Sequence, residues 1–147
     1  MSSRPTETSW HLGVGRLAVA DVMTMDPVTV GVDATIEVAE RLLAAYRISG
    51  LPVVDDTGQL VGVLSRTDLF LDGGPTLTQL VRGRASGLRV GELMSSPAVT
   101  VSLSATLVDA ARIMRDERVH RLVVVNDDEA PIGVLSATDY VTLIADG

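Results

Sequence analysis

The amino-acid sequence contains the same unit twice. The segment Val22–Leu69 aligns without a gap on Leu93–Tyr140, at a constant offset of 71 residues, and 19 of the 48 aligned pairs are identical. The longest shared block reads Gly-Val-Leu-Ser-x-Thr-Asp and begins at Gly62 and again at Gly133. Such self-similarity indicates a duplicated structural unit. A unit of about 50 residues buries too little apolar surface to be stable alone, so the two copies are expected to pack together.

Each copy predicts the element order β-α-β-β-α. In the first copy Val28–Val30 is expected to form a strand, and Thr35 can cap the helix that follows. Two apolar runs, Leu51–Val54 and Leu60–Leu64, flank the polar turn Asp55-Asp56-Thr57-Gly58, which is typical of a hairpin. The fold class is therefore α+β (mixed α/β), with two repeats packed sheet to sheet as one pseudo-twofold module.

Helical periodicity predicts which side chains of the two central helices are buried. The expected apolar stripes are Ile36, Ala39, Leu43 and Tyr46 in the first copy, and Leu107, Ala110, Ala111 and Met114 in the second. A last helix is expected from about Thr67 and again from about Thr138.

The repeats divide the chain into four parts. We expect an N-terminal tail over residues 1–16, a first repeat over 17–70, a connector over 71–89 and a second repeat over 90–145. The connector is rich in turn residues and is predicted to hold one short helix, Leu77–Val81.

Charge and composition exclude several classes of function. The net charge of -7 disfavours nucleic acid as a partner, because neutralising phosphates requires a basic surface. No apolar run approaches the roughly 20 residues of a membrane span, and the first ten residues do not resemble a secretory signal. The absence of cysteine excludes disulfides and thiolate metal sites. We therefore expect a cytoplasmic protein that binds neither nucleic acid nor membrane.

Catalytic constellations are missing from the sequence. The chain has two histidines and no cysteine, and its acidic pairs, Asp55-Asp56 and Asp127-Asp128, fall at predicted hairpin turns, where solvated polar residues are common. Neither a complete dinucleotide-binding fingerprint nor a phosphate-binding loop of the Walker type occurs. We predict no enzymatic activity, no catalytic residues, no metal site and no cofactor.

Two Ser-x-x-Asp turns are the candidate binding residues. Ser65 and Asp68 stand where a predicted strand ends and a helix begins, and Ser136 and Asp139 repeat them. A serine followed three residues later by an acid approximates a capping box, which is one explanation. Alternatively, the carboxylate can accept both hydroxyls of a ribose, while the serine hydroxyl and free helix amides suit a phosphate.

The repeated unit resembles the CBS domain, and the pair resembles a Bateman module. The resemblance rests on Val19-Ala20-Asp21-Val22-Met23-Thr24 with its partner Val90-Gly91-Glu92-Leu93-Met94-Ser95, on Leu51-Pro52-Val53-Val54-Asp55, and on the two Gly-Val-Leu-Ser-x-Thr-Asp blocks. It implies an adenosine ligand bound through Ser-x-x-Asp, and dimerisation through helices into a flat disc. We therefore expect a homodimer, and a stand-alone regulatory module that signals to a separate effector protein.

The same resemblance implies two unequal clefts, because the ribose carboxylate of one repeat faces the base pocket of the other. In nucleotide-sensing relatives such as the γ subunit of AMP-activated kinase, a similar Val-His-Arg-Leu-Val-Val-Val run supplies phosphate contacts. One cleft would join Ser65, Arg66 and Asp68 to Val119, His120 and Arg121, and the other would join Ser136 and Asp139 to Ile48, Ser49 and Gly50. The first has the cations for more phosphates, because histidine and arginine both present N–H donors.

The ligand itself stays open at this point. AMP, ADP or ATP, with or without Mg²⁺, fits the expectation, but S-adenosylmethionine or a cyclic dinucleotide would use the same ribose contacts. A dimerisation scaffold with empty clefts is the alternative from another class, since capping alone could explain both turns.

Overall fold

The structure combines helices with two β-sheets. The computed structural model describes residue 13 and residues 16–69 and 88–146, and its mixed α/β fold confirms the predicted fold class. The elements follow along the chain as α2 (Val19–Val22), β1 (Thr24–Met25), β2 (Val30–Gly31), α3 (Ile36–Tyr46), β3 (Gly50–Val54), β4 (Leu60–Ser65), the 3-10 helix η1 (Arg66–Leu69), α5 (Val90–Leu93), β5 (Thr100–Ser102), α6 (Leu107–Glu117), β6 (Arg121–Val125), β7 (Pro131–Ser136) and α7 (Ala137–Asp146). The predicted helix Leu77–Val81 lies outside the described residues.

Both repeats contain the predicted order of strand, helix, strand, strand and helix. The first reads β2-α3-β3-β4-η1 and the second β5-α6-β6-β7-α7. The first strand was predicted two residues too early: β2 begins at Val30, where pairing with Val53 starts, whereas Val28 packs on the core without belonging to the strand. The last helix begins at Arg66 in one copy and Ala137 in the other, one residue before the predicted starts.

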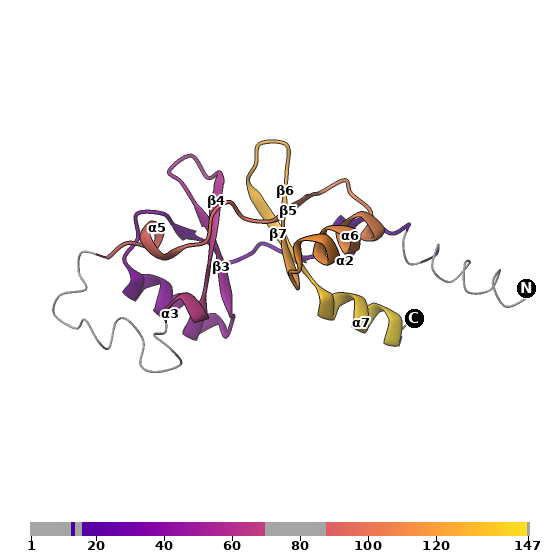
Figure 1. Cartoon of the computed structure of the whole chain (residues 1–147), viewed down its shortest axis with the longest axis horizontal. Coiled ribbons are helices and arrows are strands. Elements are labelled where there is room, and N and C mark those ends of the chain that lie inside the picture. The colour runs from indigo at the N-terminus through magenta and orange to yellow at the C-terminus, as the bar shows by residue number, and fades with distance from the viewer. Residues whose placement is uncertain (1–12, 14–15, 70–87, 147) are drawn as a thin grey trace, which may run out of the picture. The chain divides into compact units, whose positions relative to one another are not determined.

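The compact units are not the contiguous stretches of the two repeats. One unit contains the described parts of residues 1–26, 99–127 and 132–147, and the other contains those of 27–98 and 128–131. In Figure 1, α2 therefore lies with α6, and α5 lies with α3 and β4. The segment that holds α2 and β1 precedes the first repeat but belongs to the unit of the second. The segment that holds α5 precedes the second repeat but belongs to the unit of the first. We call these two the exchanged segments. The repeat limits inferred from the sequence, and the packing of sheet on sheet, stay predictions.

The two sheets have equivalent strand arrangements. In one, β2 runs parallel to β3, and β3 runs antiparallel to β4. In the other the order is β1-β7-β6-β5, with β5 parallel to β6 and β1 antiparallel to β7. The outer edge of β4 is met by Ser95 through an antiparallel bridge to Val63, in the place that β1 takes beside β7.

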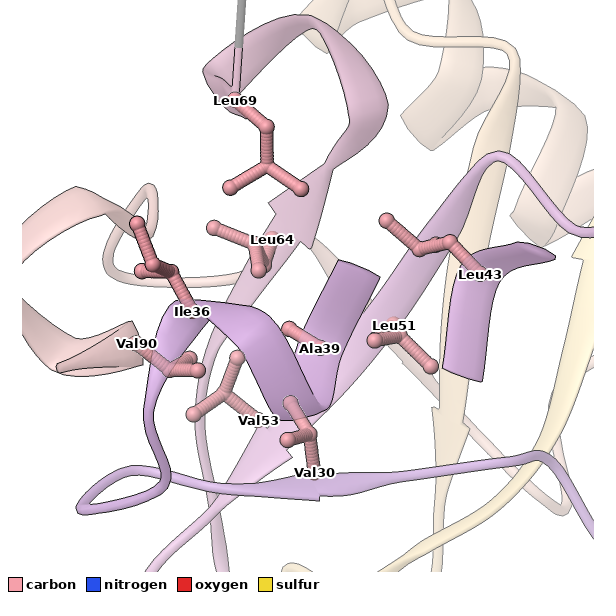
Figure 2. Close-up of a cluster of buried hydrophobic side chains, with 9 residues drawn as sticks. All are labelled: Val30, Ile36, Ala39, Leu43, Leu51, Val53, Leu64, Leu69 and Val90. Carbon is pink, nitrogen blue, oxygen red and sulfur yellow. The ribbon is translucent and has the colours of Figure 1, made fainter. Parts of the chain in front are cut away.

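Each unit has an aliphatic core between its sheet and its helices. Figure 2 shows the core of the first repeat, where the α3 side chains face those of β3 and β4. The exchanged segments contribute directly, because Val90 of α5 is buried in that cluster and Val19 of α2 in the other, both at 0% exposure. Burying such a side chain contributes about 1.5–3 kcal/mol.

The predicted helix stripes are confirmed except at one position in each helix. Ile36, Ala39 and Leu43 are buried in α3, as are Leu107, Ala110 and Met114 in α6. Tyr46 is 59% exposed and Ala111 is also exposed, so both assignments were wrong. Tyr46 is the last residue of α3, where the helix ends and the chain turns back toward β3. Ala111 follows Ala110 by about 100° around the helix, which turns it away from the core.

Helix α3 begins as the sequence predicts and ends in a strained turn that α6 repeats. The Thr35 hydroxyl accepts a hydrogen bond from the Val38 amide at 3.4 Å. Arg47 ends α3 and Arg118 ends α6, both in the left-handed region with φ of 53° and 57°. A cation at a helix C-terminus interacts favourably with the helix dipole. These two arginines reverse the chain into β3 and β6.

Both hairpin turns place one residue in the left-handed region at the same repeat position. Gly58 has φ of 86° in the first hairpin, and Glu129, its counterpart 71 residues later, has φ of 62°. A left-handed backbone costs a residue with a Cβ roughly 1–2 kcal/mol, a cost that glycine avoids. The second hairpin therefore stores strain that the first one lacks.

The Glu129→Gly substitution should stabilise the protein. Removing the Cβ relieves the left-handed strain, partly offset by the greater freedom of glycine in the unfolded chain, so the free energy of unfolding should rise by about 0.5–1 kcal/mol. Urea denaturation measures the change. Glu129→Ala keeps the strain while removing the carboxylate, and its unfolding free energy should stay near that of the wild type. An equal gain from both variants would assign the effect to the charge.

Candidate functional site

Each Ser-x-x-Asp turn is closed by a hydrogen bond between its two ends. The Ser65 amide donates to Asp68 Oδ2 at 2.8 Å, and the Ser136 amide donates to Asp139 Oδ2, also at 2.8 Å. All four residues are half-buried. The bond leaves the second oxygen of each carboxylate to other partners and holds the carboxylate in one orientation at the end of its strand.

The two turns differ in what the serine hydroxyl does. Ser136 Oγ accepts from the Asp139 amide at 3.3 Å, which completes a reciprocal capping box at the start of α7. Ser65 Oγ instead lies 2.8 Å from Thr67 Oγ1, so two hydroxyls are paired at the start of η1. The capping explanation thus describes the second turn fully and the first turn in part. Thr67 was not among the predicted site residues, although the shared Thr-Asp of both copies marked its position.

Thr106 and Asp109 provide an internal comparison for these turns. They form a capping box at the start of α6, with the Thr106 amide 3.2 Å from Asp109 Oδ2 and the Asp109 amide 3.2 Å from Thr106 Oγ1. Hydrogen bonds from the Thr106 amide and hydroxyl lower the pKa of the Asp109 carboxyl. Ser136 and Asp139 share this geometry, so hydrogen bonding within the turn does not by itself distinguish a cap from a binding site.

The start of the neighbouring antiparallel strand, β3 in the first repeat and β6 in the second, lies beside each turn. The Arg66 amide donates to the Ser49 carbonyl at 2.9 Å, and Gly50 pairs with Ser65 across β3 and β4. In the other unit the Ala137 amide donates to the His120 carbonyl at 2.8 Å.

Within each unit, therefore, the structure brings together the predicted site residues of a single repeat. One group is Ile48, Ser49, Gly50, Ser65, Arg66 and Asp68, and the other is Val119, His120, Arg121, Ser136 and Asp139. The two clefts inferred from the resemblance combine groups across the repeats and stay predictions.

Each of these two groups of residues includes an exposed arginine, supplied from a different position. In the first repeat Arg66 is exposed at the start of η1, and the strand start has Ser49 and Gly50. In the second repeat His120 and Arg121 are exposed at the strand start, and Ala137 replaces the arginine. An exposed arginine therefore lies at the helix start in the first repeat and at the strand start in the second.

Tyr140 fixes the helix that carries the second turn. Its hydroxyl donates to the Leu107 carbonyl at 2.6 Å, joining α7 to the first turn of α6. Burial, with a smaller effect of the Asp139 carboxylate, raises the pKa of Tyr140 to about 12. The neutral phenol is thus the form that the folded protein stabilises, directly beside the candidate carboxylate.

The acidic hairpin turn has a structural role. Asp55 Oδ1 accepts from the Thr57 hydroxyl at 2.6 Å and from the amides of Thr57 and Gln59 at 2.9 and 3.1 Å. Mainly through the Thr57 hydroxyl, these bonds lower the pKa of the Asp55 carboxyl.

Among the described residues, no group of three or more histidine and acidic side chains is placed to hold a metal ion. Nor does any described helix have the length and hydropathy needed to cross a membrane.

Comparison with known proteins identifies the repeated unit. A family model of the CBS domain matches residues 19–71 and again residues 90–146. A CBS domain-containing protein of Dictyostelium discoideum is 32% identical over 133 residues, covering 88% of this chain and 92% of its own length. An inosine-5'-monophosphate dehydrogenase of Korarchaeum cryptofilum is 42% identical over 82 residues, or 55% of this chain, but only 17% of that enzyme is matched.

Solved structures show the same architecture. The crystal structure of CBSX2 in complex with AMP is 32% identical, has a TM-score of 0.72, and covers 88% of this chain and 97% of its own. Another structure of CBSX2, from Arabidopsis thaliana, has a TM-score of 0.75 at 33% identity, covering 88% of this chain and 95% of its own.

Stability at high pH should depend on Tyr140. Its folded-state pKa lies above the ordinary value of 10, so its stabilisation is complete below pH 10 and is lost as the pH rises through about 12. Because the chain contains no lysine or cysteine, tyrosines are the side chains that titrate in this window. Tyr140→Phe should lower the free energy of unfolding at pH 7 by about 1 kcal/mol. It should also flatten the decline between pH 10 and pH 12 in urea denaturation curves.

Tyr46→Phe is the matched control for this experiment, because Tyr46 is 59% exposed and lies on α3. This variant should keep both the neutral-pH stability and the alkaline decline of the wild type. If Tyr140→Phe declined as steeply as the wild type above pH 10, the phenol of Tyr140 would not be the group responsible.

Proposed function

Since the chain belongs to the CBS domain family, with one match in each of its two repeats, we propose that it is a regulatory module that binds an adenine nucleotide and has no catalytic activity of its own. The observation that carries this proposal is the pair of Ser-x-x-Asp turns, each with an oriented carboxylate and an exposed cation beside it. CBSX2, 32% identical over most of its length, was crystallised with AMP. The output would pass to a separate protein.

The carboxylates of Asp68 and Asp139 are suited to a ribose. Each has one oxygen held by a serine amide at 2.8 Å, which orients the group before a ligand arrives. A carboxylate accepts hydrogen bonds through two oxygens, and a ribose offers two neighbouring hydroxyl donors. Bonds to a charged acceptor are stronger than those between neutral groups. Recognition of the ribose would therefore be common to AMP, ADP, ATP and other adenosyl ligands.

Phosphate groups would depend on arginine and histidine side chains. Arg66, His120 and Arg121 are exposed, and an arginine guanidinium matches phosphate oxygens with paired N–H donors. In the first repeat Ser65 and Thr67 add two hydroxyls within 2.8 Å of each other, whereas the hydroxyl of Ser136 already accepts from the Asp139 amide. We therefore propose that Arg66 with Ser65 in the first repeat, and His120 with Arg121 in the second, contact phosphate oxygens.

Binding should be visible as thermal stabilisation that depends on the two aspartates. AMP, ADP or ATP at about 100 times its dissociation constant should stabilise the wild type by about 2.7 kcal/mol. The double variant Asp68→Asn/Asp139→Asn should lose most of this shift, because an amide keeps one oxygen for the serine N–H but replaces the second acceptor with a donor. Differential scanning fluorimetry gives the shift, and isothermal titration gives the affinity.

Asp109→Asn is the matched control, since Asp109 closes the same kind of capping box at the start of α6. It should keep the ligand shift. Arg66→Ala and His120→Ala should weaken ATP more than AMP if these residues contact phosphates. Stabilisation by S-adenosylmethionine or a cyclic dinucleotide alone would keep the binding role but change the ligand. If no adenosyl ligand shifted the transition, the dimerisation scaffold would be the better description.

We also propose that the module forms a homodimer through α7. None of the side chains of this ten-residue helix is fully buried. Tyr140 and Leu143 pack against the core, but Val141 and Ile144 are 65% and 46% exposed. Three residues apart, they are neighbours on the surface of one helix. Exposed apolar side chains grouped in this way favour contact with another apolar surface, and a second copy provides an identical one.

The Val141→Glu/Ile144→Glu variant should dissociate the dimer, because two carboxylates would be buried without partners. Size-exclusion chromatography with light scattering should then report one chain instead of two at the same concentration. Thr142→Glu, an exposed position on the same helix, should remain dimeric. A wild-type mass of one chain at micromolar concentration would contradict the proposal, as would an unchanged dimer in the double variant.

A further inference from the structure

Two methionines pack directly on two glycines, at equivalent positions in the two units. A Cβ placed on Gly62 would lie 2.7 Å from Met94 Sδ and 2.7 Å from the Ser95 carbonyl oxygen. One on Gly133 would collide with Met23 Sδ and lie 3.0 Å from the Thr24 carbonyl oxygen. Each thioether thus fills the space that any larger residue would need. We call these two contacts, Met23 on Gly133 and Met94 on Gly62, the methionine clasps.

The clasps lie where the exchanged segments join their sheets. After Met23, β1 pairs with β7, with Thr24 opposite Val134 and Met25 opposite Gly133. After Met94, Ser95 exchanges two hydrogen bonds with Val63, at 2.9 and 3.0 Å. These joints are short, so few backbone hydrogen bonds hold the residues that follow each methionine. Upstream, α2 and α5 are held separately, with the Val19 amide bonded to the Ala105 carbonyl and the Val90 amide to the Ala34 carbonyl. The packing of the thioether on the glycine therefore adds to what keeps the residues after each methionine in place.

The sulfur atoms of the clasps are also oxidisable. The chain has no cysteine and five methionines, so oxidants that react with sulfur act on methionine. Met23 and Met94 are half-buried, which leaves a route for a small oxidant. Two other methionines are internal references, because Met25 is 64% exposed and Met114 only 8% exposed.

We propose that the methionine clasps make the joints between the exchanged segments and their sheets sensitive to peroxide. The thioether sulfur attacks one oxygen of hydrogen peroxide, the O–O bond breaks and an S–O bond forms. The sulfur loses two electrons, and the other oxygen leaves as water after taking up the peroxide protons. The product is a methionine sulfoxide, which methionine sulfoxide reductases return to the thioether.

On the side of each sulfur that faces the glycine, the packing leaves no room for an added oxygen. At Gly62 the sulfur and the Ser95 carbonyl oxygen already lie within 2.7 Å of the same point, so a sulfoxide oxygen there would face a carbonyl oxygen of like partial charge. A sulfoxide is also polar where the thioether was apolar. Oxidation should therefore push the methionine off the glycine and release the segment that follows it. The proposal does not depend on the nucleotide-binding function.

Peroxide treatment of the full chain tests this inference. Peptide mass spectrometry should show Met25 oxidised first, Met23 and Met94 next and Met114 last. As Met23 and Met94 convert, the thermal midpoint should fall by about 5 °C or more. Hydrogen exchange at the amides of Asp26 and Ser95 should accelerate at least tenfold. Incubation with a methionine sulfoxide reductase should restore both properties.

A matched pair of variants separates the clasps from the other methionines. Met23→Leu/Met94→Leu keeps an apolar side chain of similar volume but removes the sulfur, so its midpoint should change little on oxidation. Met25→Leu should remain as sensitive as the wild type. If Met23→Leu/Met94→Leu folds poorly, the order of methionine oxidation and the amide exchange rates in the wild type still test the proposal. Full conversion of Met23 and Met94 without loss of midpoint or exchange protection would overturn the proposal.

Discussion

Exchange of short segments between the two repeats is the constraint on which the rest of the structure depends. Val19 and Val90 are fully buried, yet each lies in a segment that precedes one repeat and packs in the unit of the other. Without them, each unit would lose a core side chain and the neighbour along one edge of its sheet. An unpaired sheet edge also invites pairing with other chains. Neither repeat is therefore a complete folding unit by itself.

The candidate binding residues depend on this framework. The turns Ser65–Asp68 and Ser136–Asp139 follow β4 and β7, the strands whose outer edges the exchanged segments cover. The hydrogen bond from serine amide to aspartate sets the direction of each carboxylate, and the core beneath sets its position. An oriented carboxylate needs little rearrangement to accept a ribose, which lowers the cost of binding.

Much of the fold could be predicted because local patterns decided it. The Thr35 cap, the hairpin at Asp55 and the buried positions of α3 follow from capping chemistry, turn residues and helical periodicity. Tyr46 and Ala111 were misassigned because periodicity does not reveal where a helix ends or how wide its buried face is. The candidate site was only partly predictable. Ser65 and Ser136 occupy identical positions in the sequence, but their hydroxyls have different partners, Thr67 and the Asp139 amide.

By itself, the sequence determined the duplication, the order of elements within each copy and the residue types at the candidate site, since all of these depend on neighbours along the chain. Only the tertiary structure decided which segment completes which unit. Gly62 and Gly133 read as part of a repeated strand motif, and nothing near them in sequence indicates a methionine. The physical reason is steric: a glycine opens a space, but the residue that fills it is chosen by packing between segments far apart in the chain.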